Sequence, residues 1–196
     1  RILPPFVLFM ILYSTLPLLW GQTDGANSLN DLSRLLLNFP SLAGHLWFMY
    51  PLISLYLIIP VVSPWLERSG AKDERIFLGI FAFSTLTPWL HRFVSAELWG
   101  ECFWNPTPML HYFTGFVGYF LLGYYIKRYG ALSTRTSLLI LIGAYCFTVA
   151  VFQYRLGKVT MVADLEVCWR FCGVNIAMMA YAVFSLVSRI PWKGNN

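Results

Sequence analysis

The chain has 196 residues, of which 58% are hydrophobic, 18% aromatic and only 12% charged. Soluble domains carry about 25% charged residues, so 14 Lys and Arg with 9 Asp and Glu leave too little charge to cover a soluble globule of this size. The many aromatic and branched residues exclude a disordered chain, while 14 Gly and 4 Cys exclude collagen-like and disulfide-rich scaffolds. We therefore predict a polytopic membrane protein.

The net charge of +5 does not indicate a nucleic-acid partner. The basic residues stand in short clusters between apolar runs rather than along one helix face or in one tail. The aromatic residues, which could otherwise stack on bases, lie inside the apolar runs. We expect no nucleic acid among the partners of this chain.

Six runs without Asp, Glu, Lys or Arg dominate the chain, and each is interpreted as a membrane-spanning helix, since about 20 apolar residues cross the hydrocarbon core. The runs are continuously apolar, which favours helices over the alternating strands of a membrane barrel. The third run is the shortest and contains Pro88. The predicted fold class is all-α, a transmembrane helical bundle with spans at about 2–21, 46–66, 76–92, 108–126, 136–154 and 171–188.

A short amphipathic helix is predicted between the first two spans, at about 29–39. Ser28 and Asp31 match the spacing of a capping box, and apolar residues follow at helical spacing. Pro40 ends this pattern. A helix of this kind lies in the plane of the membrane surface.

The charges between the runs orient the bundle. Six spans place both termini on one side, and nine basic residues fall on that side against five on the other. The positive-inside rule therefore predicts that both termini are cytoplasmic. No repeat or linker divides the sequence, so residues 1–196 are predicted to form a single membrane domain. The nine residues are Arg1, Arg68, Lys72, Arg75, Lys127, Arg128, Arg135, Arg189 and Lys193, and the five are Arg34, Arg92, Arg155, Lys158 and Arg170.

The second span is the most informative segment. His45 stands at its outer mouth, Tyr50 follows, and Pro51 and Pro60 each remove a helix hydrogen bond. Broken membrane helices are tolerated where they face protein or a wet cavity, and ionisable residues at that depth usually serve function. One interpretation is a functional, cavity-lining His45. The other, favoured by composition alone, is an interfacial aromatic belt with prolines that shape packing.

A charged and aromatic cluster lies in the loop at 91–106. Glu97 and Glu101 are four residues apart, and therefore share one face if the loop is helical. Arg92 and Trp104 add a cation and a ring, so Arg92, Glu101 and Trp104 are candidate contacts for a sugar or a lipid-linked head group. An ordinary solvated loop with interfacial tryptophans is the alternative.

The fourth span begins near His111 and contains small residues. Thr114 and Gly118 form a small-xxx-small pair with Gly115 on the adjacent face, which favours close helix packing over a ligand site. His111 lies near the outer mouth and carries the same two interpretations as His45. The four cysteines lack zinc-ligand spacing, so no metal is expected, and motifs of soluble phosphate-binding or hydrolytic enzymes do not occur.

Three stretches resemble one family, in the same order as in that family. The stretch His45-Leu-Trp-Phe-Met-Tyr-Pro is similar to the signature span of the acyltransferase family 3 membrane enzymes, which include bacterial surface-polysaccharide O-acyltransferases. Arg1-Ile-Leu-Pro-Pro-Phe resembles the start of that family's third helix. Tyr112-Phe-Thr-Gly-Phe-Val-Gly-Tyr resembles a later span. The order of the motifs carries the resemblance.

The resemblance implies an O-acyltransferase of the bacterial cytoplasmic (inner) membrane. Such an enzyme moves an acyl group, here expected to be acetyl, from acyl-CoA to a hydroxyl of a cell-surface glycan. Acyl-CoA would then be a co-substrate, with no bound cofactor. Membrane lipid and a glycan or lipid-linked glycan acceptor are the expected partners.

Two parts of the family pattern have no match in this chain. The family's catalytic histidine lies on its first helix, after an arginine, and its closing helices end in a Ser-x-Gly-x-Tyr-Leu-x-His motif. We therefore expect helices three to eight of a longer acyltransferase, inactive alone, with the catalytic histidine upstream of Arg1. A lipid-linked glycan transporter or flippase and a non-catalytic membrane subunit are the alternatives. His45 and Tyr50 are candidate contributors to catalysis, and the candidate substrate-binding residues are Arg92, Glu101, Trp104 and His111.

Overall fold

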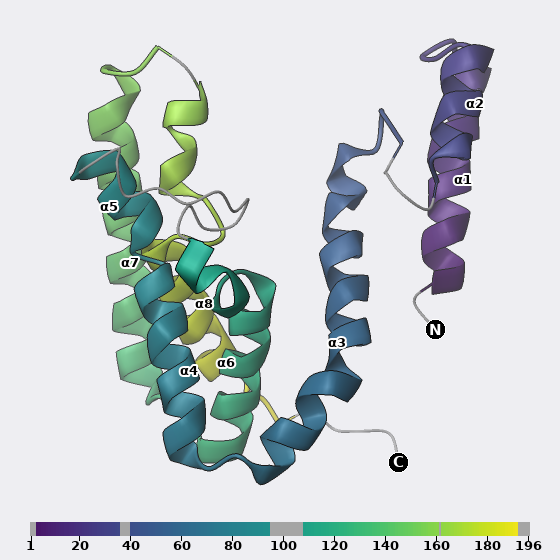
Figure 1. Cartoon of the computed structure of the whole chain (residues 1–196). Coiled ribbons are helices and arrows are strands. Elements are labelled where there is room, and N and C mark those ends of the chain that lie inside the picture. Colours follow the sequence, from purple (N-terminus) through teal and green to yellow (C-terminus); the bar gives the residue numbers. More distant parts are fainter. Residues whose placement is uncertain (1–2, 36–39, 95–107, 161, 192–196) are drawn as a thin grey trace. The chain divides into compact units, whose positions relative to one another are not determined.

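The computed structural model describes residues 3–35, 40–94, 108–160 and 162–191 (Figure 1). All regular secondary structure in these residues is helical, which confirms the all-α prediction. The chain divides into two compact units, Arg1–Ser63 and Pro64–Asn196. The single membrane domain expected over the whole chain stays a prediction.

The first unit is built around two helices that pack side by side, α1 and α2 (Figure 1). The buried Ser28 hydroxyl of α2 donates a hydrogen bond to the carbonyl oxygen of Ser14 in α1 at 2.6 Å. A short 3-10 helix, η1, leads into α3, whose last turns belong to the second unit. The elements are α1 (Leu3–Leu19), α2 (Gly25–Ser33), η1 (Gly44–Phe48) and α3 (Met49–Arg68).

The interfacial helix predicted at 29–39 is wrong in its bounds, because α2 begins and ends earlier. Asp24, rather than Ser28, is the N-cap, since Asp24 Oδ1 accepts a hydrogen bond from the backbone N–H of Asn27 at 2.7 Å. Ser28 lies inside the helix and makes the contact with α1. The last residues of the predicted helix, 36–39, lie outside the described residues.

The prolines of α3 do not break it. Pro51 lies in the first turn, where a missing N–H costs no intrahelical hydrogen bond, and the helix continues through Pro60 to Arg68. The span predicted at about 46–66 is therefore one continuous α-helix preceded by η1. The irregular backbone lies at 44–48, where His45 is found.

The second unit consists of helices that lie side by side (Figure 1). α6 contacts both α4 and α8, and α8 also packs along α7. Its elements are α4 (Ala71–Ser84), α5 (Thr87–Phe93), η2 (Pro108–Phe113), α6 (Phe116–Tyr129), α7 (Thr134–Leu156), η3 (Val162–Asp164), η4 (Glu166–Cys168) and α8 (Val174–Val187).

The span predicted at 76–92 is divided between α4 and α5. Hydroxyl groups at the division bond back to carbonyl oxygens three residues earlier: Ser84 to Phe81 at 2.6 Å and Thr87 to Ser84 at 2.8 Å. Such local bonds compete with continuation of the helix. Pro88 then sits in the first turn of α5, where its fixed φ suits a helix start.

Small side chains fill the interface of α7 with α8, while large apolar side chains face outward. Ser137 in α7 and Ser185 in α8 are fully buried. Leu139 and Ile142, on the outer side of α7, are 73% and 58% exposed. This distribution is costly in water, but it is the usual one where lipid covers the outer face and small residues let helices approach closely.

Two helices in the described part of the chain are long and apolar enough to cross a membrane, Gly44–Arg68 and Thr134–Leu156. The apolar helices α1 and α8 are shorter than that criterion. The predicted number of six spans and the cytoplasmic position of both termini stay predictions.

The close approach of α4 and α6 depends on Gly118, as the small-residue spacing predicts. A β-carbon at this position would lie 2.0 Å from the ring of Phe81, which is 3% exposed. Thr114 is also buried, and Gly115 has a φ of 71° at the start of α6, a region that glycine adopts without strain. The predicted packing role is confirmed for Gly118, whereas Thr114 and Gly115 precede the first residue of α6.

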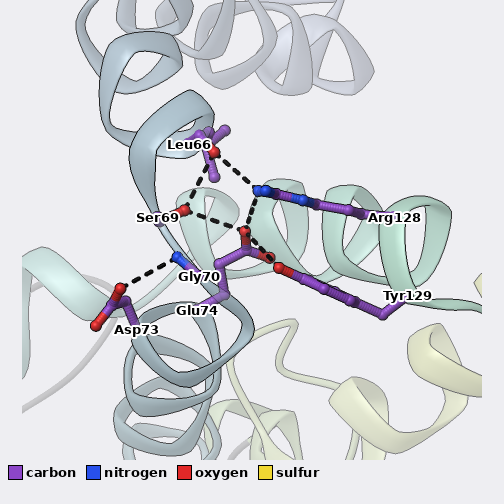
Figure 2. A network of polar contacts seen from close by, with 7 residues as sticks. All are labelled: Leu66, Ser69, Gly70, Asp73, Glu74, Arg128 and Tyr129. Carbon is purple, nitrogen blue, oxygen red and sulfur yellow. Dashed lines mark hydrogen bonds and ion pairs between the residues drawn. The ribbon is translucent and has the colours of Figure 1, made fainter.

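A buried carboxylate joins α4 to α6 and to the end of α3 (Figure 2). Glu74 is 3% exposed, and its Oε1 accepts hydrogen bonds from Arg128 Nη1 at 2.7 Å and from the Ser69 hydroxyl at 3.1 Å. The same Arg128 nitrogen donates to Leu66 O at 2.9 Å, and the Tyr129 hydroxyl lies 3.4 Å from Glu74 Oε1. Partial burial raises the pKa of the Tyr129 phenol, which therefore stays protonated as a donor.

The charged residues of the second unit sort to its two ends. At one end, Arg128 meets the start of α4, and Arg189 at the end of α8 donates to the carbonyl oxygens of Ala131 and Leu132 at 3.0 and 2.6 Å. At the other end, Arg92 pairs with an acid in the connection between α7 and α8. This sorting follows the division of basic residues on which the orientation prediction rests.

Candidate functional site

His45, the principal sequence candidate, lies in η1 of the first unit. Its side chain is exposed, and its imidazole meets the ring of Tyr13 in α1 edge-on, with centroids 5.0 Å apart and planes at 72°. An edge-on contact fixes the position of a ring without using its nitrogen atoms. The imidazole can therefore be held in place and still accept or donate a proton.

Tyr50, the second catalytic candidate, packs into the core of the first unit. Its ring meets Phe6 at 5.6 Å and 90°, beside the buried residues Met10 and Leu46. Its hydroxyl donates to Leu35 O at 3.4 Å, a long hydrogen bond. This arrangement gives Tyr50 the role of fixing the start of α3 against α1, directly after the segment that carries His45.

Asp31 fastens the turn that precedes η1. Its Oδ2 accepts hydrogen bonds from the backbone N–H of Ser41 at 3.0 Å and from the Ser41 hydroxyl at 2.9 Å. The turn continues through Ala43, whose N–H donates to Pro40 O at 2.8 Å. Asp31, which the sequence spacing predicts to cap a helix, therefore positions the segment that leads to His45.

Two hollows adjoin the edge-on pair of Tyr13 and His45. The first measures about 410 Å³ and the second about 340 Å³, and both are lined by Phe9 and Tyr13. The first has a mainly apolar wall, to which His45 and Tyr13 contribute an imidazole and a phenol. A largely apolar cavity with a few polar groups is the usual form of a small-molecule site. Its lining residues are Pro5, Phe6, Phe9, Tyr13, His45, Leu46, Phe48 and Met49.

Arg92, a predicted substrate contact, is ion-paired in the second unit. Its Nη2 lies 2.6 Å from Asp164 Oδ1, which joins α5 to η3, and the two side chains are 39% and 34% exposed. Aromatic rings surround this end of the unit, since Trp89 stacks on Phe93 with centroids 5.6 Å apart and the Arg155 guanidinium lies 5.3 Å from the same ring. The charged and aromatic cluster predicted at 91–106 therefore also involves Arg155 in α7 and Asp164 after it.

Two of the remaining candidates, Glu101 and Trp104, lie outside the described residues. His111 lies in η2, and the structure describes its backbone but not its side chain. His45 and Tyr50 both lie in the first unit, where they contact different residues of α1, and Arg92 belongs to the second unit. Among residues 3–35, 40–94, 108–160 and 162–191, no group of three His, Cys, Asp or Glu side chains could hold a metal ion.

A family model described as an acyltransferase domain matches residues 1–193, nearly the whole chain. The chain belongs to acyltransferase family 3. This confirms the resemblance carried by the His45 span, and enzymes of this family are generally embedded in membranes. The comparisons with curated proteins and with solved structures find no match to this acyltransferase chain.

Sequence reasoning missed three residues that build the surroundings of the acyltransferase candidates. Tyr13 carries no motif, and only the packing of α1 brings it to His45. Asp31 was assigned to a cap because its spacing from Ser28 fits one. Asp164 belongs to no motif, and charge sign alone leaves nine acidic residues as possible partners of Arg92.

Proposed function

We propose that this chain forms part of a membrane O-acyltransferase that transfers an acyl group, acetyl in the simplest case, from acyl-CoA to a hydroxyl of a cell-surface glycan. The observation that carries the proposal is the acyltransferase family match over residues 1–193. The hollow beside His45 supports it, because an apolar wall with an imidazole suits an acyl group and a hydroxyl.

The proposed reaction is general-base catalysis. A base takes the proton of the acceptor hydroxyl while its oxygen attacks the thioester carbonyl carbon, so that a C–O bond forms and the C–S bond breaks. The leaving thiolate takes up a proton and departs as CoA. Hydrogen-bond donors in a dry cavity stabilise the oxyanion that develops during the attack.

The proposal gives the residues of this chain supporting roles. His45 donates to or accepts from the reacting groups, and Tyr50 positions the helix start beside it. Arg92 contacts the acceptor. Its guanidinium can leave Asp164 or bond Asp164 and the acceptor at the same time, because a half-exposed ion pair is weak. The family's catalytic histidine belongs to a helix that no segment of this chain matches, so we assign the chain to the middle helices of the enzyme.

The setting of the reaction is part of the same proposal. Acyl-CoA is the co-substrate, the acceptor is a glycan or lipid-linked glycan, and the enzyme resides in the bacterial inner membrane. Six spans with both termini in the cytoplasm bring the donor and the acceptor to opposite faces. The larger share of basic residues at the end of the second unit that contains Arg128 and Arg189 supports this orientation.

The decisive experiment substitutes His45 in the full-length protein that carries this sequence. His45→Phe keeps an aromatic ring against Tyr13 and removes both nitrogen atoms. We expect glycan acylation to fall at least tenfold at unchanged protein abundance. Leu29→Ala, an exposed position on α2, is the matched control and should leave acylation unchanged.

Three results would contradict the proposal. If His45→Phe still acylates the glycan, the imidazole nitrogen atoms have no part in the reaction and the ring serves only in packing. An equal fall of acylation and abundance would mean that the residue only supports the fold. If vesicles containing the protein move lipid-linked glycan while neither acylated glycan nor free CoA forms, the protein is a transporter.

A further inference from the structure

The second unit contains a groove between α4, α6 and α8, which shares no lining residue with the hollow beside His45. It measures about 640 Å³, within the range of sites for organic ligands. Its walls are almost wholly apolar. The apolar lining residues include Leu78, Ala82, Phe83, Leu122, Val174 and Met178.

One end of the groove is polar and cationic. Arg75 in α4 and Tyr125 in α6 both line it, and Arg75 Nε donates a hydrogen bond to the Tyr125 hydroxyl at 2.9 Å. This bond fixes the guanidinium at the mouth of the groove. No acceptor among the described residues bonds its two terminal nitrogen atoms, so four N–H groups are left for a ligand.

The carboxylates nearest in sequence do not neutralise Arg75. Asp73 Oδ2 accepts from the backbone N–H of Gly70 at 3.1 Å, as the start of α4 requires. Glu74 is buried in its contacts with Arg128 and Ser69 (Figure 2). Among the described residues, no carboxylate therefore pairs with Arg75 at this end of the apolar groove.

The surroundings of this mouth add positive charge. Lys72 is exposed in the first turn of α4, and Lys127 is exposed at the end of α6, which reaches α4 through the contact of Arg128 with Glu74. Basic pockets between membrane helices attract anionic lipid head groups, and arginine bonds a phosphate through two N–H groups at once.

We propose that this groove binds one anionic phospholipid, with an acyl chain along the apolar walls and the phosphate on the terminal nitrogen atoms of Arg75. The proposal concerns a second site and does not depend on acyl transfer. A single uncompensated guanidinium matches the single phosphate of such a lipid. An acyl-CoA carries several phosphates and a purine, for which this mouth offers too few partners.

The head-group half of the proposal is tested with the full-length protein purified in detergent. Binding of phosphatidylglycerol and of phosphatidylcholine with identical chains is measured by native mass spectrometry. We expect wild type to prefer phosphatidylglycerol and Arg75→Gln to bind it about tenfold more weakly, the loss of one charged hydrogen-bonded contact. Lys158→Gln, which removes the same charge beyond the C-terminal end of α7 and outside the groove, should change binding less than twofold.

The acyl-chain half is tested by filling the groove. Gly79 lines it, and a β-carbon there meets no atom within 4 Å, so Gly79→Leu extends into open space. We expect this variant to lose bound phosphatidylglycerol although Arg75 is intact. Gly143→Leu on α7, where a β-carbon also meets nothing within 4 Å, is the matched control. Ala82→Phe, at another lining position, replaces Gly79→Leu if that variant does not fold.

Four results would contradict the lipid-binding proposal. Equal losses in Arg75→Gln and Lys158→Gln would mean diffuse surface attraction and overturn the site. If Gly79→Leu and Ala82→Phe both bind the lipid as wild type does, the acyl chain does not lie in the groove and the proposal is overturned. Equal competition by inorganic phosphate would mean a simple anion site, and displacement by long-chain acyl-CoA at lower concentration would mean a donor site; either result refutes the proposal.

Discussion

Replacing Arg128 with methionine should destabilise the protein through the carboxylate that it leaves behind. Glu74 is 3% exposed, and its closest contact is the 2.7 Å bond to Arg128. Removing one partner of a buried ion pair costs about 3–5 kcal/mol, because the other charge stays buried and unpaired. The Arg128 side chain is 34% exposed, which weakens the pair. We therefore expect Arg128→Met to lower the free energy of unfolding by about 2–3 kcal/mol.

The second substitution identifies the cause of this loss. Glu74→Gln removes the charge while its amide oxygen can still accept from Ser69, so the double variant with Arg128→Met should be more stable than Arg128→Met alone. A double-mutant cycle should give a coupling energy above about 1 kcal/mol. Lys127→Met, the exposed neighbour on α6, is the control and should stay within about 0.5 kcal/mol of wild type.

The assay is unfolding of the purified full-length protein in mixed detergent micelles of increasing denaturing fraction, followed by tryptophan fluorescence. The reasoning is refuted if Arg128→Met behaves like Lys127→Met. It is also refuted if the coupling energy with Glu74→Gln is indistinguishable from zero, because the buried carboxylate would then not be the source of the loss.

The same unfolding assay checks two further predictions. Gly118→Ala should lower the free energy of unfolding by about 1–3 kcal/mol, because its β-carbon would lie 2.0 Å from the Phe81 ring. Adding Phe81→Leu should recover part of this loss. Gly123→Ala, whose β-carbon would have its nearest atoms at 4.0 Å, is the control and should be almost neutral. Asp31→Ala should cost about 1 kcal/mol by freeing Ser41, and adding Ser41→Ala should cost little more; fully additive losses would mean that the two residues act separately.

The sequence alone predicts helices well where composition is uniform. The long apolar runs at α3 and α7 lie within a few residues of their predicted bounds, because hydropathy and helix propensity act together there. The predictions are poorest where polar side chains have a choice of partners. Ser28 can cap a helix or bond Ser14, and Ser84 can sit in a helix or end one; packing of neighbouring helices decides each case.

The candidate site follows the same division. His45 could be selected from its motif, because the motif is local. The contacts that surround it could not, since Tyr13 lies on another helix and no periodicity connects the two. Long-range ion pairs could not be predicted from the sequence either, because 14 basic and 9 acidic residues allow many pairings. The predicted side of the membrane alone does not select Asp164 as the partner of Arg92.

The buried serines of α7 and α8 have a consequence for how this helix pair can vary. Ser137 and Ser185 have no hydrogen-bond partner for their hydroxyls within the described part of the chain, so the interface does not use their polarity. Alanine should serve as well in either place, whereas leucine would separate the helices. Leu139, exposed on an apolar helix, could become any apolar residue if lipid covers this face. Along this pair, side-chain volume rather than hydropathy separates the inside from the outside.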